Sequence, residues 1–401
     1  MAEKELKFKI LAKDRKSAAR LGEIKTVHGT LLTPEFIPVG TKGTVKSLDF
    51  EQLKKINLNC FFVNTYHLHL QPGEDRVFDL GGLHRFIGWN KLLMTDSGGF
   101  QVFSQARNSS FGGRRALAGA ETETLAKIDE DGVTFKSFKD GSVHRFTPEK
   151  SIEIQKKLGA DIILAFDECT YYPATYEYAK KAMERTHRWA GRCLEAFKKR
   201  SRFNQGLYGI VQGSVFEDLR KKSARFVGSL PFAGLAIGGV SVGESKTEMA
   251  KVLEWVIPDL PEEKSRHLLG VGEIDDIFEL VARGIDTFDC VMPTRLARMG
   301  LLLVKPQSPK KNRPKGKEFT LDITKPIYGK DESPIESDCR CETCLHHSRA
   351  YLNHLFKEKE LLAYTLATYH NLWFMARLTQ EIRESLGRGS FLKLRKHWLG
   401  R

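Results

Sequence analysis

Polar residues that can do chemistry stand directly after short apolar segments along this chain. In chain order they are Asp96, Asp167, Glu168, Gln212, Gly238, Gly239 and Asp289. A single acid in such a place is often only a helix cap, but three segments that end in acids, with an amide and two glycines between them, predict a reaction site. Two opposed carboxylates can share a substitution at carbon, one attacking and the other moving protons, as in retaining glycosidases. We interpret Asp96 and Asp289 as such a pair.

The polar groups between these acids are suited to a flat heterocycle. Gln212 and the backbone of Gly238 and Gly239 offer amide donors and acceptors. Phe100, which follows the SGG turn after Asp96, is placed either to stack on a ring or to pack in the core. The sequence favours neither role of Phe100 over the other.

A cysteine cluster near the C-terminus predicts a metal site. Cys339, Cys341 and Cys344 place three of the seven cysteines within six residues, which is a zinc pattern rather than a disulfide framework. A histidine would complete a closed, structural tetrahedron, and spacing does not choose among the available ones. The candidates are His346, His347, His354 and His370.

Eight apolar runs must position these groups. They occupy residues 36–40, 60–64, 91–96, 161–168, 207–213, 234–239, 267–273 and 287–293. Continuous apolar runs are typical of strands buried on both faces, and amphipathic helical patterns separate most of them. This alternation favours an α/β fold of the (β/α)8 TIM-barrel type, in which the site lies at the carboxyl ends of the strands. A doubly wound open sheet is the alternative, but the Gly-rich dinucleotide fingerprint is missing. Hairpins are expected at 133–147, with a tight primed turn at Asp140–Gly141, and around 23–34.

Charge and hydropathy narrow the class of protein. The formal net charge is +14, and the densest basic stretches are residues 305–317 and 388–401. Such stretches fit either a solvated surface or a partner such as RNA. Residues 104–130 are small and polar, which predicts a loop.

No long apolar run or signal peptide is visible, so we expect no membrane segment and a cytoplasmic location.

Several motifs resemble the bacterial-type tRNA-guanine transglycosylases, also called queuine tRNA-ribosyltransferases. They are DSGGFQ at 96–101, FDECT at 166–170, VQG at 211–213 and FDCVMPTR at 288–295, together with the cysteine cluster and the His370 of ATYHNLWF. The resemblance covers about residues 8–385. Members of the family are zinc-bearing (β/α)8 barrels and usually homodimers.

The resemblance implies a role for each matching residue. Asp289 would attack C1′ of the wobble guanosine to form a covalent tRNA–enzyme intermediate, and Asp96 would be the general acid and base. The implied base-binding residues are Asp96, Phe100, Asp167, Gln212, Gly239, Val240, Glu244 and Leu269. Arg295 and Arg298 would contact tRNA, and His370 becomes the fourth ligand of one structural Zn²⁺ per chain. The implied domains are a barrel at 1–304 with part of the C-terminal helices, and a zinc-binding, tRNA-contacting region at 305–401.

The implied reaction replaces the wobble guanine of the tRNAs for Asp, Asn, His and Tyr, recognised at U-G-U in the anticodon loop. Val242 and Cys169 resemble the forms that insert preQ1 (7-aminomethyl-7-deazaguanine), because their bulk leaves no room for the cyclopentenediol of queuine. Ser241 and residues 294–298 are closer to the queuine-using forms. We expect preQ1. The alternatives are a queuine-salvaging enzyme, a non-catalytic tRNA-binding subunit, and a hydrolase that removes the base.

Overall fold

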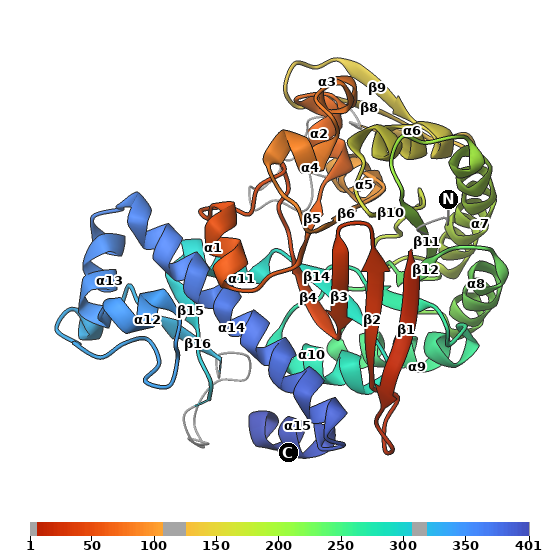
Figure 1. Ribbon diagram of the computed structural model, residues 1–401. Helices are drawn as coiled ribbons and strands as arrows, with labels where there is room; N and C mark the ends of the chain where they lie inside the picture. Colours follow the sequence, from red (N-terminus) through yellow and green to blue (C-terminus); the bar gives the residue numbers. More distant parts are fainter. Residues whose placement is uncertain (1–5, 107–125, 307–318, 401) are drawn as a thin grey trace, which may run out of the picture.

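Eight parallel strands form the centre of the protein, seen in a computed structural model that describes residues 6–106, 126–306 and 319–400. The strands are β4 (Glu35–Pro38), β5 (Cys60–Val63), β6 (Leu92–Thr95), β10 (Ile162–Leu164), β11 (Gly206–Val211), β12 (Gly234–Ile237), β13 (Ser265–Leu268) and β14 (Thr287–Cys290). Their spatial order is β4-β14-β13-β12-β11-β10-β6-β5. A parallel bridge between Val39 and Phe62 joins the first strand to the last, so the sheet closes into a barrel (Figure 1). The predicted (β/α)8 architecture is confirmed, and the open sheet is excluded.

The strands form where the apolar runs predicted them, but they are shorter than the runs. The run at 161–168 contributes only Ile162–Leu164 to the sheet, and the acids after it lie in the loop. One face of the strands fills the barrel with a single apolar cluster that includes Phe62, Met94 and Tyr208. The other face packs against the surrounding helices, so both faces of the sheet are buried. The polar residues at the strand ends are therefore left at the rim of the barrel.

A three-stranded antiparallel sheet covers the amino-terminal end of the barrel. It consists of β1 (Lys7–Lys13), β2 (Arg20–Thr26) and β3 (Gly29–Thr33), which lie in front of the barrel in Figure 1. Ile24 and Leu31 reach into the apolar cluster of the barrel interior. The hairpin expected around residues 23–34 is confirmed. Because this end is covered, the carboxyl end of the strands is the end available for a substrate.

The helices alternate with the strands. The barrel helices predicted from their amphipathic patterns are α6 (Pro148–Leu158), α7 (Tyr176–Lys198), α8 (Glu217–Ser229), α9 (Lys246–Val256) and α10 (Ile274–Ala282). Thr147 caps the start of α6 through its side chain, and Gly159 ends it in the left-handed conformation. Shorter elements are α1 (Phe50–Lys55), α2 (Thr65–Leu70), α3 (Glu74–Asp79), α4 (Leu83–Ile87), α5 (Gly99–Ala106), α11 (Met292–Arg298) and a 3₁₀ turn at Ile257–Asp259.

A small sheet is inserted between α5 and α6. It consists of β7 (Ala126–Ile128), β8 (Val133–Lys136) and β9 (Val143–Phe146). The expected hairpin is present, but the prediction of a tight two-residue turn at Asp140–Gly141 was wrong. The Ser137 N–H donates to the Ser142 carbonyl (2.8 Å), which leaves a four-residue loop, and the Asp140 side chain accepts from both the backbone and the hydroxyl of Ser142. Most of the loop expected at 104–130 lies outside the described residues, and its end forms β7.

The C-terminal part joins the barrel along one long helix. It contains β15 (Leu301–Leu303), β16 (Thr320–Asp322), a 3₁₀ turn at Pro326–Tyr328, α12 (Glu342–His346), α13 (Arg349–Lys357), α14 (Leu361–Gly387) and α15 (Phe391–Leu399). Thr379 and Arg383 of α14 both bind the buried Glu35 at the start of β4. The domain boundary after residue 304 stays a prediction, and most of the basic stretch 305–317 lies outside the described residues. None of the described helices is long and apolar enough to cross a membrane.

Candidate active site and metal centre

Asp96 lies directly after β6 and is surrounded by hydrogen-bond donors. The Thr65 N–H donates to one carboxylate oxygen (2.7 Å), and the side-chain amide of Asn64 donates to the other. Asn64 also caps α2, because its side-chain oxygen accepts from the His67 N–H (3.0 Å). This bond orients the amide so that its nitrogen points to Asp96. The pKa of Asp96 is raised from 3.8 to about 7, because burial and, to a lesser extent, the charge of Asp289 outweigh the hydrogen bonds that lower it. Asp96 can therefore give and take a proton near neutral pH.

Asp289 is in β14, and two donors hold one of its carboxylate oxygens. His267 Nε2 lies 3.2 Å from Oδ1 of Asp289, and the Gly270 N–H donates to the same oxygen (3.1 Å). Since an ionised carboxylate only accepts, His267 is the donor in that contact. His267 is fully buried and stacks on Phe62 with a centroid distance of 5.7 Å. Sequence reasoning missed this histidine, because nothing in its local pattern distinguishes it from an interior strand residue.

Asp167 and Gln212 form a buried polar pair beside these carboxylates. The Gln212 side-chain nitrogen donates to Oδ2 of Asp167 (2.6 Å), and the Ser97 hydroxyl lies 3.3 Å from Oδ1. Burial raises the pKa of Asp167 to about 6, and the bonds from Gln212 and Ser97 oppose this. The side-chain oxygen of Gln212 is buried with no hydrogen-bond partner among the described residues. An unsatisfied acceptor next to a carboxylate is suited to a ligand with several N–H groups.

The loop after β12 packs against the Gln212 side chain. A Cβ added at Gly239 would meet the Gln212 side-chain oxygen at 2.3 Å, so only glycine lets the backbone approach the amide this closely. Val240 is buried, and Glu244 accepts hydrogen bonds from the backbone of Ser241 and Val242. Glu244 thus holds the shape of the loop.

The remaining predicted base-binding residues lie at the same end of the barrel. Phe100, at the start of α5, is 51% exposed, which excludes the core-packing role and leaves its ring available for stacking. Leu269 follows β13 and packs against the apolar cluster of the interior.

Positive charge gathers beside Asp289. Arg295 and Arg298 lie on α11, immediately after β14, and the Arg298 side chain donates to the Thr294 carbonyl (2.7 Å). Partial burial lowers the pKa of Lys46, and the charges of Arg298, Lys42 and Arg295 lower it further. Arg295, Arg298 and Lys42 therefore lie close enough to Lys46 for their charges to act on it, and these four residues are here called the cationic strip. Sequence reasoning missed Lys42 and Lys46, which come from the loop after β4.

The cysteine cluster is assembled with one histidine. Cys339, Cys341, Cys344 and His370 are buried, and their ligand atoms all lie within 4.8 Å of one another. The Nδ1 atom of His370 is 3.5 Å from the Cys341 sulfur and 3.4 Å from the Cys344 sulfur. On the far side of the ring, Nε2 donates to the Leu303 carbonyl (2.7 Å), which presents the Nδ1 lone pair to the sulfurs. Three thiolates and one imidazole fit a tetrahedral metal site with no open position.

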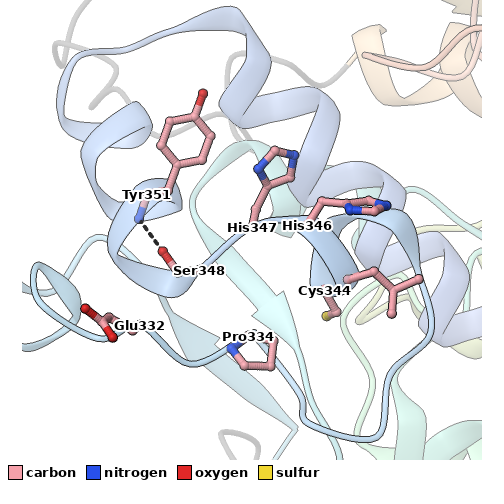
Figure 2. Close-up of a pocket in the computed structure, with 8 residues that line it drawn as sticks. Glu332, Pro334, Cys344, His346, His347, Ser348 and Tyr351 are labelled. Atoms are coloured by element: carbon pink, nitrogen blue, oxygen red, sulfur yellow. Dashed lines mark hydrogen bonds between the residues drawn. The ribbon is translucent and has the colours of Figure 1, made fainter.

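The other histidines near the cluster belong to a surface cavity of about 440 Å³ (Figure 2). His346 and His347 line it with Cys344, and His347 stacks on Tyr351 (5.3 Å, 27°). The cavity lies beside the cysteine cluster, so it is separate from the carboxylate site at the barrel mouth. Of the candidates that spacing left open, the structure brings His370 to the three cysteines.

Comparisons with known proteins agree with this geometry. A family model described as queuine tRNA-ribosyltransferase matches residues 14–401. The chain is 49% identical over 383 residues to the queuine tRNA-ribosyltransferase of Herpetosiphon aurantiacus, covering 96% of this chain and 90% of that protein. It is 46% identical over 410 residues to a putative queuine tRNA-ribosyltransferase of Archaeoglobus fulgidus, covering 98% and 99%. It is 46% identical over 393 residues to the corresponding protein of a Thermoanaerobacter species, covering 98% and 96%.

Proposed function

Because the chain belongs to the queuine tRNA-ribosyltransferase family, and is thus a pentosyltransferase that carries out tRNA-guanine transglycosylation, we propose that it replaces the wobble guanine with preQ1 through a covalent Asp289–ribose intermediate. The tRNA substrates are those for Asp, Asn, His and Tyr, read at U-G-U in the anticodon loop. The observation that carries this proposal is the unequal setting of the two carboxylates. Asp289 has one oxygen held by two donors, whereas Asp96 is desolvated and titrates near neutrality.

In the first half of the reaction, Oδ2 of Asp289 attacks C1′ of the guanosine. The new C–O bond forms as the bond from C1′ to the base breaks, and the proton of Asp96 passes to the departing guanine. Its pKa of about 7 keeps a large fraction of Asp96 protonated at neutral pH, which an unperturbed aspartate would not be. In the second half, the Asp96 carboxylate takes a proton from the incoming base. That base then attacks C1′ and releases Asp289.

The base is held by the pocket next to these carboxylates. Asp167 and Gln212 supply a carboxylate and a free amide oxygen for the N–H groups of the purine-like edge, and Phe100 stacks on the ring. The backbone at Gly239 and Val240 and the side chains of Glu244 and Leu269 would complete the contacts with the base. The cationic strip neutralises phosphates on both sides of the wobble position, with Arg295 and Arg298 as its two predicted members.

Val242 and Cys169 support preQ1 as the incoming base. Both side chains are only partly exposed, and next to the bound base their bulk would oppose the cyclopentenediol of queuine. Queuine is the second candidate, because Ser241 and residues 294–298 resemble the queuine-using forms and because the relatives carry that name. Competition of unlabelled preQ1 and queuine against labelled guanine distinguishes the two bases.

The Cys₃His cluster would hold one structural zinc ion per chain. Its donor set and its burial fit Zn²⁺, and the closed site leaves no position for a catalytic water. The ion would tie the segment around α12 to α14 and supplies no step of the exchange. We further propose a homodimer in the cytoplasm, which sedimentation and fractionation test.

The direct test is incorporation of labelled guanine into unmodified tRNA-Tyr. We expect the wild type to incorporate label, and to leave a tRNA–protein adduct that survives denaturing electrophoresis. Asp289→Ala should show neither, whereas Glu273→Gln, which removes another carboxylate near the strand ends but outside the site, should retain both.

Each other outcome identifies an alternative. Wild-type protein that binds tRNA without exchange would be a non-catalytic subunit. Release of abasic tRNA without base incorporation would indicate a hydrolase. Exchange that persists in Asp289→Ala would refute the role of Asp289.

A further inference from the structure

Arg220 of α8 is a cation that is completely buried behind the proposed base pocket. Its Nε donates to the Ser214 carbonyl (2.6 Å), one terminal nitrogen to those of Val211 (3.1 Å) and Gly238 (2.8 Å), and the other to that of Gly239 (2.9 Å). In the described part of the chain its donors reach main-chain carbonyls and no carboxylate. A buried guanidinium without a counter-ion opposes folding, and burial lowers the pKa of Arg220 to about 10. A residue kept in so unfavourable a place needs a reason beyond packing.

The hydrogen bonds of Arg220 fix two consecutive peptide planes. In a trans peptide the N–H points opposite to the carbonyl. Because the carbonyls of Gly238 and Gly239 both face Arg220, the N–H groups of Gly239 and Val240 must point away from it. The Gly239 N–H meets the Cys169 sulfur, which is a weak acceptor that a stronger one can displace. The Val240 N–H makes no hydrogen bond with any residue that the structure describes.

The Gln212 side chain also packs closely against these two glycines. A Cβ at Gly238 would meet the Gln212 side-chain nitrogen at 2.6 Å, and one at Gly239 would meet its oxygen at 2.3 Å. The same Cβ at Gly239 would lie 3.3 Å from the Arg220 guanidinium, so Gln212 and Arg220 both constrain the backbone at this position. Neither peptide can rotate without breaking its bond to Arg220.

We propose that Arg220 is a positioning residue that locks the peptides after β12 as hydrogen-bond donors, so that the pocket selects a base with an oxo group at this edge and rejects one with an amino group. This inference rests on the proposed function, since it concerns the base that the same pocket accepts. A locked donor facing an amino group would leave both buried and unpaired, which is the strongest form of discrimination between similar ligands. Guanine and 7-deazaguanines carry the oxo group, and 2,6-diaminopurine carries an amino group in its place.

The test is the Arg220→Lys variant, which keeps the charge but cannot reach four carbonyls. We expect the KM for guanine to rise about tenfold or more, as the loss of one or two well-made hydrogen bonds implies, while kcat at saturating base stays within about threefold. The preference for guanine over 2,6-diaminopurine should fall by a similar factor. A merely structural role would reduce stability or the active fraction without changing this preference.

Arg266 provides a matched control at the opposite end of the barrel. It is also buried, it donates to the Leu260 carbonyl (3.3 Å), and burial lowers its pKa to about 10 as well. Arg266→Lys should lower the melting temperature and leave the guanine KM and the base preference unchanged. If both lysine variants change the base preference equally, Arg220 has no special role.

A measurement on the wild type covers the case in which Arg220→Lys does not fold. In the guanine-incorporation assay, 7-deazaguanine should compete and a hundredfold excess of 2,6-diaminopurine should not. Effective competition by 2,6-diaminopurine, or an Arg220→Lys enzyme with unchanged guanine KM and preference, would overturn the inference. Both results require that the wild type incorporates guanine, so they are distinct from a failure of the exchange reaction itself.

Discussion

Replacing Asn64 by serine should make the first chemical step faster at alkaline pH. The Asn64 amide does two things: its oxygen caps α2, and its nitrogen donates to the Asp96 carboxylate. Serine is as good a helix cap, but it carries no amide donor. A donor to the ionised form of an acid lowers its pKa, so its removal raises the pKa of Asp96 above the present value of about 7. The protonated acid that serves the departing guanine then persists to higher pH.

The size of the effect follows from the hydrogen bond that is lost. A bond to a charged group contributes about 1.5–3 kcal/mol, and one pKa unit corresponds to about 1.36 kcal/mol, so we expect the pKa of Asp96 to rise by about one unit. At pH 8 an acid of pKa 7 is about 9% protonated and one of pKa 8 is about 50% protonated, whereas at pH 6 both are almost fully protonated. Asn64→Ser should therefore gain about fivefold at pH 8 and nothing at pH 6.

The assay is single-turnover formation of the tRNA–protein adduct between pH 5.5 and 9, with enzyme in excess over unmodified tRNA. The quantity of interest is the ratio of the rate at pH 8 to the rate at pH 6, because any general loss of activity cancels in it. The wild-type rate should fall tenfold per pH unit above about pH 7, and the melting temperature of the variant should match that of the wild type. A variant ratio equal to or below the wild-type ratio would refute this account of Asp96, as would a wild-type profile that is flat from pH 6 to 9.

Three further outcomes test other parts of the site. His267→Phe should keep the buried ring but lose the bond to Asp289, lowering kcat by about 10- to 100-fold at unchanged KM for tRNA; a change under twofold would contradict the positioning role. Lys46→Ala should weaken tRNA binding and reduce the slope of log KM against log salt by about one, with the guanine KM unaffected as the internal control. Cys341→Ser should lose bound zinc and roughly 5–10 °C of melting temperature, whereas Cys193→Ser, a buried cysteine outside the cluster, should retain its zinc.

Much of the barrel could be predicted because strands that are buried on both faces have continuous apolar sequences. Each of the eight apolar runs overlaps a strand, and Thr147 and Gly159 bound α6 as their residue types predict. The errors lie at the ends of elements. The run at 161–168 was interpreted as one strand, but its register with β6 ends at Ile163 and its register with β11 ends at Leu164. The loop at Asp140–Gly141 is wider than its dipeptide suggests because the side chains of Asp140 and Ser142 bond to each other within it.

The candidate site was likewise predictable from the sequence only in part. The sequence by itself determined which residues stand at strand ends and which three cysteines lie close together, since both are properties of neighbours along the chain. It left Phe100 between two roles and the fourth metal ligand among four histidines. The tertiary structure decided these by exposing Phe100 and by bringing α14 across the cysteine cluster.

Only the folded barrel decided what surrounds the two carboxylates. Asn64 reaches Asp96 from the neighbouring strand end, His267 reaches Asp289 from another, and Arg220 reaches the β12 loop from α8. These contacts depend on the order and register of parallel strands that close on themselves, which no local pattern specifies. The sequence could therefore predict Asp96 and Asp289 as the reacting pair, but the raised pKa of Asp96 and the hydrogen bonds that orient Asp289 are properties of the closed barrel.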